Sequence, residues 1–158
     1  MLHQVLAAVG GVSLGWGRVF FLYGLHEAPS RLVPSVVAPL LRDKPALLGD
    51  GRAQRDFMHV QDVASAPVAV LDRGHVGAVN IATGECHTIG DVAMALAWQI
   101  GRPDLVRLGA RQTPANEPQA LFTTAVVLRN IGFRPRFTLP AGLADTVTWW
   151  RSVNDSVD

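Results

Sequence analysis

The feature that most constrains this chain is a compact apolar run at residues 19–23, Val-Phe-Phe-Leu-Tyr, which a glycine ends. A run without polar alternation is typical of a strand buried on both faces, as in the middle of a parallel sheet. Only a short helix precedes it, predicted over residues 2–9 from its apolar spacing. We therefore interpret residues 1–24 as the end of a larger sheet.

Short apolar segments alternate with helical periodicity along the rest of the chain, and no linker divides it. The sequence predicts further helices at residues 31–42, 62–71 with Asp62 as N-cap, 88–100 with Thr88 as N-cap, 124–131 and 141–153. It predicts further strands at 46–48, 55–60, 78–82 and near 106. This alternation is typical of the α/β class.

Composition supports one packed domain and excludes several classes of function. The 158 residues are 49% hydrophobic and 17% charged, the reverse of a disordered chain. A net charge of +1 gives no basic field for nucleic acid or a membrane surface. One cysteine, Cys86, leaves no internal disulfide and too few thiolates for zinc. The apolar N-terminus lacks a preceding Lys or Arg, so we expect a cytoplasmic chain without signal peptide or membrane span.

A cluster of glycines, Gly10, Gly11, Gly15 and Gly17, invites comparison with a dinucleotide-binding loop. That loop requires the order strand, glycine turn, helix, because the pyrophosphate sits at the helix N-terminus. The order here is helix, glycine turn, strand, and the spacing differs as well. We interpret the cluster as a helix stop.

Arg55 is the most informative single residue, because it begins the segment R-D-F-M-H-V beside a glycine-bearing turn. A guanidinium at the mouth of a strand can bind a diphosphate in a forked geometry. A salt bridge to Asp56 or Asp62 explains it equally well. Similarly, the loop that carries Arg111, Asn116 and Glu117 could hold a phosphate and a ribose, or could simply be exposed.

Other polar and aromatic groups carry weaker signals. His59 could pair with Asp62 on a metal or with a serine in a hydrolase, but a packed histidine is the better interpretation. The His26-Glu27 pair could contact a ligand, but a solvated loop is the better interpretation. Trp149-Trp150 should bury one ring and expose the other.

Eight segments in fixed order carry a resemblance to a known family. They are R-V-F-F-L-Y-G at 18–24, R-L-V-P at 31–34, G-D-G at 49–51, R-D-F-M-H-V at 55–60 with Asp62, V-N-I-A-T-G at 79–84, Thr88-Ile89, L-R-N-I-G-F-R-P at 128–135 and Gly142-Leu143. Together they resemble the C-terminal half of the extended short-chain dehydrogenases/reductases, the NAD-dependent nucleotide-sugar epimerases and dehydratases. The resemblance extends from Met1 to about Trp150.

The resemblance implies a fold: the last parallel strand or strands of a Rossmann-type sheet plus a small mixed α/β substrate-binding domain. Residues 1–158 would form a single substrate-binding portion, residues 1–24 would be a remnant of the Rossmann sheet edge, and the N-terminal NAD-binding half would be absent.

The resemblance also implies a substrate site for a nucleotide-diphosphate sugar. Arg55 matches the arginine that binds the diphosphate, and Arg111 matches a second arginine of that subsite. Asn80 matches the asparagine of the strand motif beside it. Arg31 and Leu32 match the stretch that leads into the substrate-binding helix and contacts the nucleotide.

Leu22 and Tyr23 match the strand end that approaches the nicotinamide and the hexose, and are the cofactor-binding candidates. Two positions depart from the family pattern. Phe21 stands where the family often has asparagine, which removes a direct sugar contact, and Leu25 stands where proline is usual.

The family's catalytic machinery is not found in this sequence. Its enzymes use a Tyr-x-x-x-Lys pair in which the lysine lowers the tyrosine pKa while hydride passes to NAD. Here the one tyrosine, Tyr23, and the one lysine, Lys44, stand 21 positions apart, so no catalytic residue is assigned. NAD(P) is the implied cofactor, and we expect that this chain alone does not bind it. The opening helix matches the one that follows that lysine in the family, so Met1 is expected to begin just downstream of it.

Three functional hypotheses remain. The chain is the nucleotide-sugar-binding part of an NAD-dependent epimerase/dehydratase, active with a Rossmann half on the same or another polypeptide. Alternatively, it is a non-catalytic binding protein or a regulator of a full-length homologue. A third possibility is a gene remnant without activity of its own. No nucleic acid or membrane partner is expected.

Overall fold

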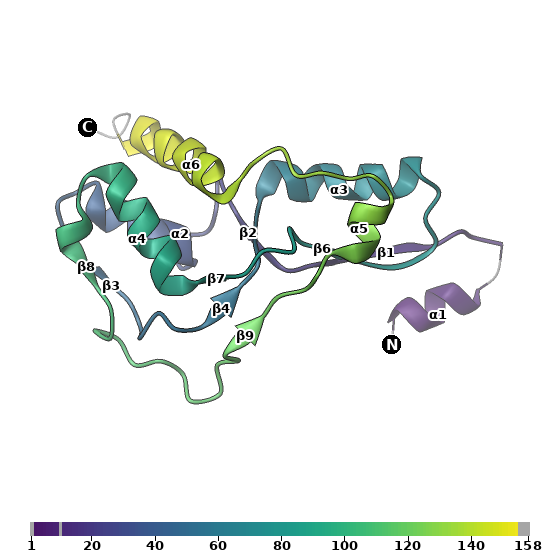
Figure 1. Ribbon diagram of the computed structural model, residues 1–158, viewed down its shortest axis with the longest axis horizontal. Helices are drawn as coiled ribbons and strands as arrows, with labels where there is room; N and C mark the ends of the chain where they lie inside the picture. The colour runs from purple at the N-terminus through teal and green to yellow at the C-terminus, as the bar shows by residue number, and fades with distance from the viewer. Residues whose placement is uncertain (1, 10, 155–158) are drawn as a thin grey trace.

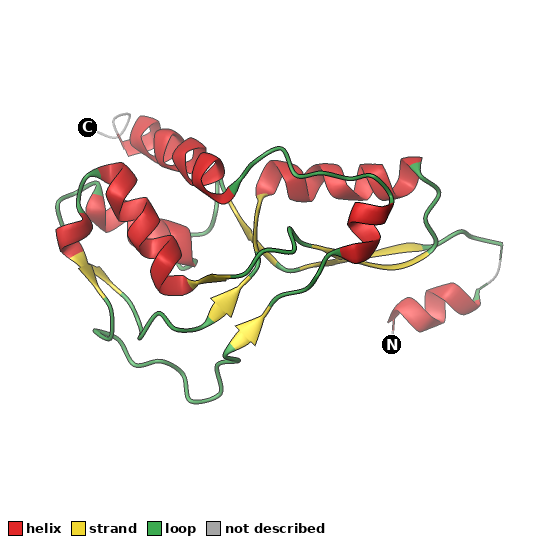
Figure 2. Ribbon diagram, in the orientation of Figure 1, coloured by secondary structure: helices red, strands yellow, loops and turns green. Residues whose placement is uncertain are grey.

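The computed structural model describes residues 2–9 and 11–154, which form an α/β arrangement of short parallel strands and helices (Figures 1 and 2). The helices are α1 (Leu2–Ala8), α2 (Leu32–Leu40), α3 (Val60–Asp72), α4 (Ile89–Ile100), the 3-10 turn η1 (Pro103–Leu105), α5 (Val126–Asn130) and α6 (Leu139–Asn154). The strands are β1 (Gly15–Val19), β2 (Phe21–Tyr23), β3 (Ala46–Leu47), β4 (Gln54–Arg55), β5 (Phe57–His59), β6 (Gly77–Ile81), β7 (His87–Thr88), β8 (Val106–Arg107) and β9 (Ala120–Leu121).

Most strand pairs are parallel. β1 pairs with β6 and β2 with β5, while β3 pairs with β8. β4 lies between β7, which is antiparallel to it, and β9, which is parallel. The predicted α/β class is confirmed, and β9 is a strand that the sequence analysis did not predict.

The interior consists of two apolar clusters on either side of β5. One cluster joins α2, α4 and α6; the other lies between α3, α5 and β6 (Figure 1). Adjacent residues of β5 divide between them, because Phe57 packs in the first cluster and Met58 in the second. This is the side-chain alternation expected of a strand that is covered on both faces.

Two buried carboxylates, one directly before β5 and one in the first turn of α3, accept hydrogen bonds from neighbouring loops. Asp56 accepts hydrogen bonds from the amide and hydroxyl of Thr83 and from the amide of Gly84, at 2.7–2.8 Å. Asp62 accepts from the amides of Arg136 and Phe137 at 2.9 and 3.0 Å. Each carboxylate therefore satisfies backbone donors that the loops leave unpaired.

The predicted apolar strand is wrong in its extent and in its burial. It consists of two strands, because the amide of Phe20 donates to Ile81 while the amide of Phe21 donates to Asp56, so that the backbone changes partner from β6 to β5. β1 pairs only with β6 among the described residues, and Val19 is 46% exposed. β1 is therefore more exposed than the strand buried on both faces that the apolar run predicted.

Two smaller predictions also differ from the structure. His59, not Asp62, is the N-cap of α3, since Asp62 lies inside the first turn and binds the α5–α6 loop instead. Trp149 and Trp150 are both half-buried and meet edge to face with ring centroids 5.1 Å apart. The Thr88 cap of α4 is confirmed by its side chain, which accepts from the amide of Asp91.

The two ends of the fold differ in their packing. α1 lies apart from the other elements (Figure 1), and Val5 on it and Val9 just after it are largely exposed. None of the helices in residues 2–9 and 11–154 has the length and apolarity needed to cross a bilayer. At the other end, α6 crosses close to β2 and β5, with Gly142 at the point of contact.

Candidate functional site

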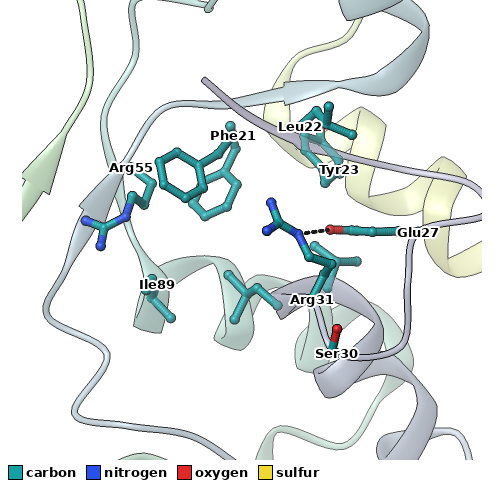
Figure 3. A pocket seen from close by; sticks show the side chains of 11 residues that line it. Phe21, Leu22, Tyr23, Glu27, Ser30, Arg31, Arg55 and Ile89 are labelled. Atoms are coloured by element: carbon teal, nitrogen blue, oxygen red, sulfur yellow. Dashed lines mark ion pairs between the residues drawn. The ribbon is translucent and has the colours of Figure 1, made fainter. Parts of the chain in front are cut away.

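A cavity of about 170 Å³ lies at the end of β2, next to the first turns of α2 and α4 (Figure 3). Its walls are apolar, with a few charged groups. The residues that line it are Phe21, Leu22, Tyr23, Glu27, Ser30, Arg31, Leu32, Val33, Arg55, Phe57 and Ile89. In a parallel sheet the carboxyl ends of the strands are where ligands bind, so the position is the expected one for a site.

Arg55 lies at one end of this cavity with its side chain only 4% exposed. Its Nη1 donates to the carbonyl oxygens of Gln54 and Pro118 at 2.8 Å, and its Nη2 donates to Glu117 Oε1 at 2.9 Å. The guanidinium carbon lies 5.2 Å from the ring centre of Phe21, within cation–π range. These bonds use three of the five guanidinium donors and fix the plane of the group.

The partner of Arg55 is a finding that sequence reasoning missed. The salt bridge joins Arg55 to Glu117, not to Asp56 or Asp62, which the sequence analysis offered. Those two carboxylates are instead used by backbone amides. No local signal could have shown this, because the partners are 62 positions apart in the chain.

Arg31 and Glu27 face one another at the other end of the cavity (Figure 3). Arg31 Nε lies 3.8 Å from Glu27 Oε1; the Arg31 side chain is 53% exposed and that of Glu27 only 7%. Burial raises the pKa of Glu27 to about 7, although Arg31 and a backbone hydrogen bond at Gly24 oppose the shift. The prediction of a solvated loop is therefore wrong for Glu27. Its position after the end of a parallel strand was the signal that could have found it.

The predicted cofactor residues occupy the same wall but present little chemistry. Leu22 and Leu32 are half-buried and contribute apolar surface. Tyr23 is buried, its hydroxyl is directed to the carbonyl oxygen of Leu139 at 3.5 Å, and its ring packs edge to face on His59. Burial, with the charges of Asp62 and Asp145, raises the Tyr23 pKa, so the phenol stays protonated.

Arg111 lies in a neighbouring cavity, between the loop after β3 and the loop after β8. Its amide donates to the carbonyl oxygen of Leu48 at 2.9 Å and its side chain is exposed. Ile89 lines both cavities, and Glu117 lines the second while it binds Arg55 in the first. Glu117 thus binds one predicted diphosphate arginine, Arg55, and lines the cavity that holds the other, Arg111.

Asn80 is not brought to either cavity. It lies on β6 opposite Arg18 of β1, where its Nδ2 donates to Thr123 Oγ1 at 3.0 Å. Asn80, Arg18 and Thr123 all line a separate small cavity beside α5. The structure therefore groups Arg55, Arg31, Leu32, Leu22 and Tyr23, places Arg111 next to them, and leaves Asn80 apart.

His59 is fully buried between Tyr23, Phe137 and α6, as the packed-histidine interpretation requires. Its Nε2 lies 3.3 Å from Asp145 Oδ2, and burial lowers its pKa against the opposing effect of Asp145. Within the part of the chain that the structure describes, no three His, Cys, Asp or Glu side chains gather as metal ligands.

The two predicted cofactor residues fit a dinucleotide poorly. The sequence contains no G-x-G-x-x-G and no Tyr-x-x-x-Lys. Leu22 offers only an aliphatic side chain, and the hydroxyl of Tyr23 is turned toward α6. The donors that would hold a pyrophosphate of NAD are therefore not provided by these two residues.

The family follows from comparison with known proteins. A model of the NAD-dependent epimerase/dehydratase family matches residues 1–82, which is more than half of the chain. The chain belongs to this family, and the resemblance stated from the eight segments is confirmed.

Its relatives are enzymes that act on nucleotide sugars. A dTDP-4-dehydro-6-deoxy-D-allose reductase from a Streptomyces species is 31% identical over 129 residues, which is 81% of this chain and 39% of the relative. The GDP-L-fucose synthase of Escherichia coli is 29% identical over 140 residues, or 82% of this chain and 40% of the enzyme. The chain spans about two fifths of the length of these curated relatives.

Solved structures agree on the fold. The dTDP-glucose 4,6-dehydratase of Bacillus anthracis, in complex with NAD, superimposes with a TM-score of 0.88 at 24% identity, covering 98% of this chain and 50% of that one. The predicted Rossmann-type relationship is thereby confirmed at the level of the fold.

Proposed function

We propose that this chain is the substrate-binding portion of an NAD-dependent epimerase, dehydratase or reductase and that its cavity at β2 binds a nucleotide-diphosphate sugar. Residues 1–158 act as one substrate-binding unit, in which residues 1–24 supply the edge of the Rossmann-type sheet. The observation that carries this proposal is the cavity itself, where two arginines from different elements, Arg31 and Arg55, meet apolar walls.

The charges of the cavity suit a diphosphate. Arg55 is held in place by Glu117 and two carbonyl groups, so little side-chain entropy is lost when an anion binds. Arg31 is half exposed at the rim and precedes α2, whose first turn has no side-chain cap. Uncapped amides and the helix dipole favour a negative group there. Arg111 in the adjoining cavity extends the basic surface toward the nucleotide.

The cofactor and the catalytic pair are proposed to come from an NAD-binding half, on the same or another polypeptide. An apolar groove of about 470 Å³ runs between β1 and α3, lined by Val19, Val70, Leu71 and Ile81 among others. The exposed apolar surface of this groove supports association with a further layer of the fold. A sharp, reversible unfolding transition of a clean monomer would contradict this association.

Calorimetric titration of the purified chain with UDP-glucose, dTDP-glucose and GDP-mannose tests the binding proposal. Binding of at least one is expected, and Arg55→Ala should weaken it by about 1–3 kcal/mol, roughly 5- to 150-fold, the scale for a lost charged hydrogen-bond partner. Arg42→Ala is the matched control, since Arg42 is exposed beyond the other end of α2. Unchanged affinity in Arg55→Ala would refute the diphosphate assignment.

Reconstitution separates the enzyme from the alternatives. The chain is mixed with the NAD-binding half of a relative, and turnover of the nucleotide sugar is followed by chromatography. Restored turnover supports the split or divided enzyme. Nucleotide-sugar binding without turnover supports a binding or regulatory protein. If neither binding nor turnover is observed, a gene remnant is the remaining explanation.

A further inference from the structure

Glu27 is a buried carboxyl group of which one oxygen, Oε2, has no hydrogen-bond partner among the described residues. It stands in the loop between β2 and α2 and points into the cavity (Figure 3). Its side chain is 7% exposed, and Oε2 is buried with no hydrogen-bond partner in residues 2–9 and 11–154. Buried polar groups are nearly always hydrogen-bonded, so an orphaned carboxylate oxygen in a cavity requires an explanation.

The ion pair with Arg31 does not supply that explanation. The closest approach, 3.8 Å from Arg31 Nε to Oε1, is longer than a hydrogen bond, and it involves the other oxygen. Arg31 is also half exposed, so water competes for its guanidinium. A pair this loose contributes little to stability.

Two other polar groups of the cavity bind elsewhere. Arg55 is bound to Glu117, and the hydroxyl of Tyr23 is directed to Leu139. Ser30 Oγ lines the cavity but the structure shows no bond from it to Glu27. No side chain in residues 2–9 and 11–154 therefore supplies a donor to Oε2 of Glu27, which lies in the wall of the cavity.

We infer that Glu27 Oε2 accepts a hydrogen bond from a ring hydroxyl of the sugar and thereby sets the specificity of the cavity for neutral, hydroxylated hexoses. The inference rests on the proposed function, because it places the sugar beside the diphosphate that Arg31 and Arg55 bind. A site built to hydrogen-bond a hydroxyl rejects ligands that lack it. A carboxylate also repels an anionic sugar such as a uronate.

Titrations at pH 8 with UDP and UDP-glucose, and with dTDP and dTDP-glucose, separate the two parts of the ligand. The wild-type chain is expected to bind a glucose conjugate about 10-fold or more tightly than its nucleoside diphosphate, as expected for a hydrogen bond to a charged group. Glu27→Leu should abolish this ratio and leave nucleoside diphosphate affinity unchanged or slightly higher. Glu85→Gln, at a carboxylate that is 69% exposed, is the matched control.

A second measurement does not depend on the stability of a variant. The carboxyl carbon of Glu27, followed by NMR in the wild-type chain, should titrate with a pKa of about 7 in the absence of ligand. Saturation with the glucose conjugate should lower this pKa, because a hydroxyl donor favours the charged form. The nucleoside diphosphate alone should not lower it. The charged or titratable groups that face Glu27 in the cavity, Arg31, Arg55 and Tyr23, are the same in both titrations.

The outcomes are distinct. If nucleoside diphosphates bind but Glu27→Leu keeps the full sugar-dependent gain, the role of Glu27 is refuted while the proposed function stands. If the pKa of Glu27 is the same with the glucose conjugate as without ligand, the role of Glu27 is likewise refuted while the proposed function stands. If neither nucleoside diphosphate nor conjugate binds the wild-type chain, the proposed function fails, and the assignment of Glu27 fails with it.

Discussion

The close approach of α6 to β2 depends on a glycine and can be tested by adding one methyl group. A Cβ at Gly142 would overlap the Tyr23 hydroxyl and would lie 3.0 Å from Tyr23 Cζ and 3.3 Å from His59 Cδ2. Real Cβ atoms rarely come this close to other heavy atoms, so either the helix or the tyrosine must shift. We predict that Gly142→Ala destabilises the chain even though alanine favours helix.

The magnitude follows from two opposing effects. Overpacking of a well-packed interior costs about 1–3 kcal/mol. Alanine in place of glycine within a helix stabilises by about 1 kcal/mol, so the net loss is up to about 2 kcal/mol. Tyr23→Phe removes the overlapping atom, and it should itself cost less than about 1 kcal/mol because the bond to Leu139 is long, at 3.5 Å.

Urea unfolding of the wild-type chain, both single variants and the double variant measures this coupling. In the Tyr23→Phe background, Gly142→Ala should be neutral or stabilising, which gives a coupling energy of about 1–2 kcal/mol. Effects that add within about 0.5 kcal/mol would show that the hydroxyl does not limit the position of α6. A stabilising Gly142→Ala in the wild-type background would refute the reasoning outright.

Three further predictions concern buried carboxyl groups. Asp56→Asn should cost about 2–4 kcal/mol in urea unfolding, because in either orientation its NH₂ faces a donor, the amide of Gly84 or the donors of Thr83; an unchanged midpoint would contradict this. Asp62→Ala should cost about 2–3 kcal/mol and should speed hydrogen exchange at the amides of Arg136 and Phe137, which lose their acceptor. Glu27→Gln tests the raised pKa of about 7. Protonated Glu27 is favoured by the fold, so wild-type stability falls as the pH rises from about 4.5 to about 7. Because water at the cavity mouth screens the charge, Glu27→Gln should be more stable than the wild-type chain by only about 1–2 kcal/mol at pH 8, and equally stable near pH 4.5. A stability difference that does not depend on pH would contradict the raised pKa of Glu27.

Much of the element order could be predicted because its signals are local. The periodicity of residues 89–100 and the cap at Thr88 correctly predicted α4, and the glycines after residue 9 correctly predicted the end of α1. The apolar run at 19–23 correctly indicated strand. It did not reveal that the backbone changes partner at Phe20, because the choice between β5 and β6 is a long-range one.

The candidate site, too, could be predicted only in part from the sequence. The segment that begins at Arg55 indicated a binding arginine, and the structure places that residue in a cavity with Arg31. The charge of Glu27 suggested a solvated loop, since charged residues are exposed in most proteins. Its burial depends on how α2 folds back against the end of β2, which no pattern within the loop records.

The sequence by itself determined the class of the fold, the family and the approximate ends of most helices. These depend on periodicity, capping and an ordered set of motifs. The tertiary structure decided which groups meet: Glu117 with Arg55, Asp62 with the α5–α6 loop, and Glu27 with Arg31 at the cavity. Burial and hydrogen bonding are properties of packed surfaces between distant segments. They become defined only when those segments are in contact.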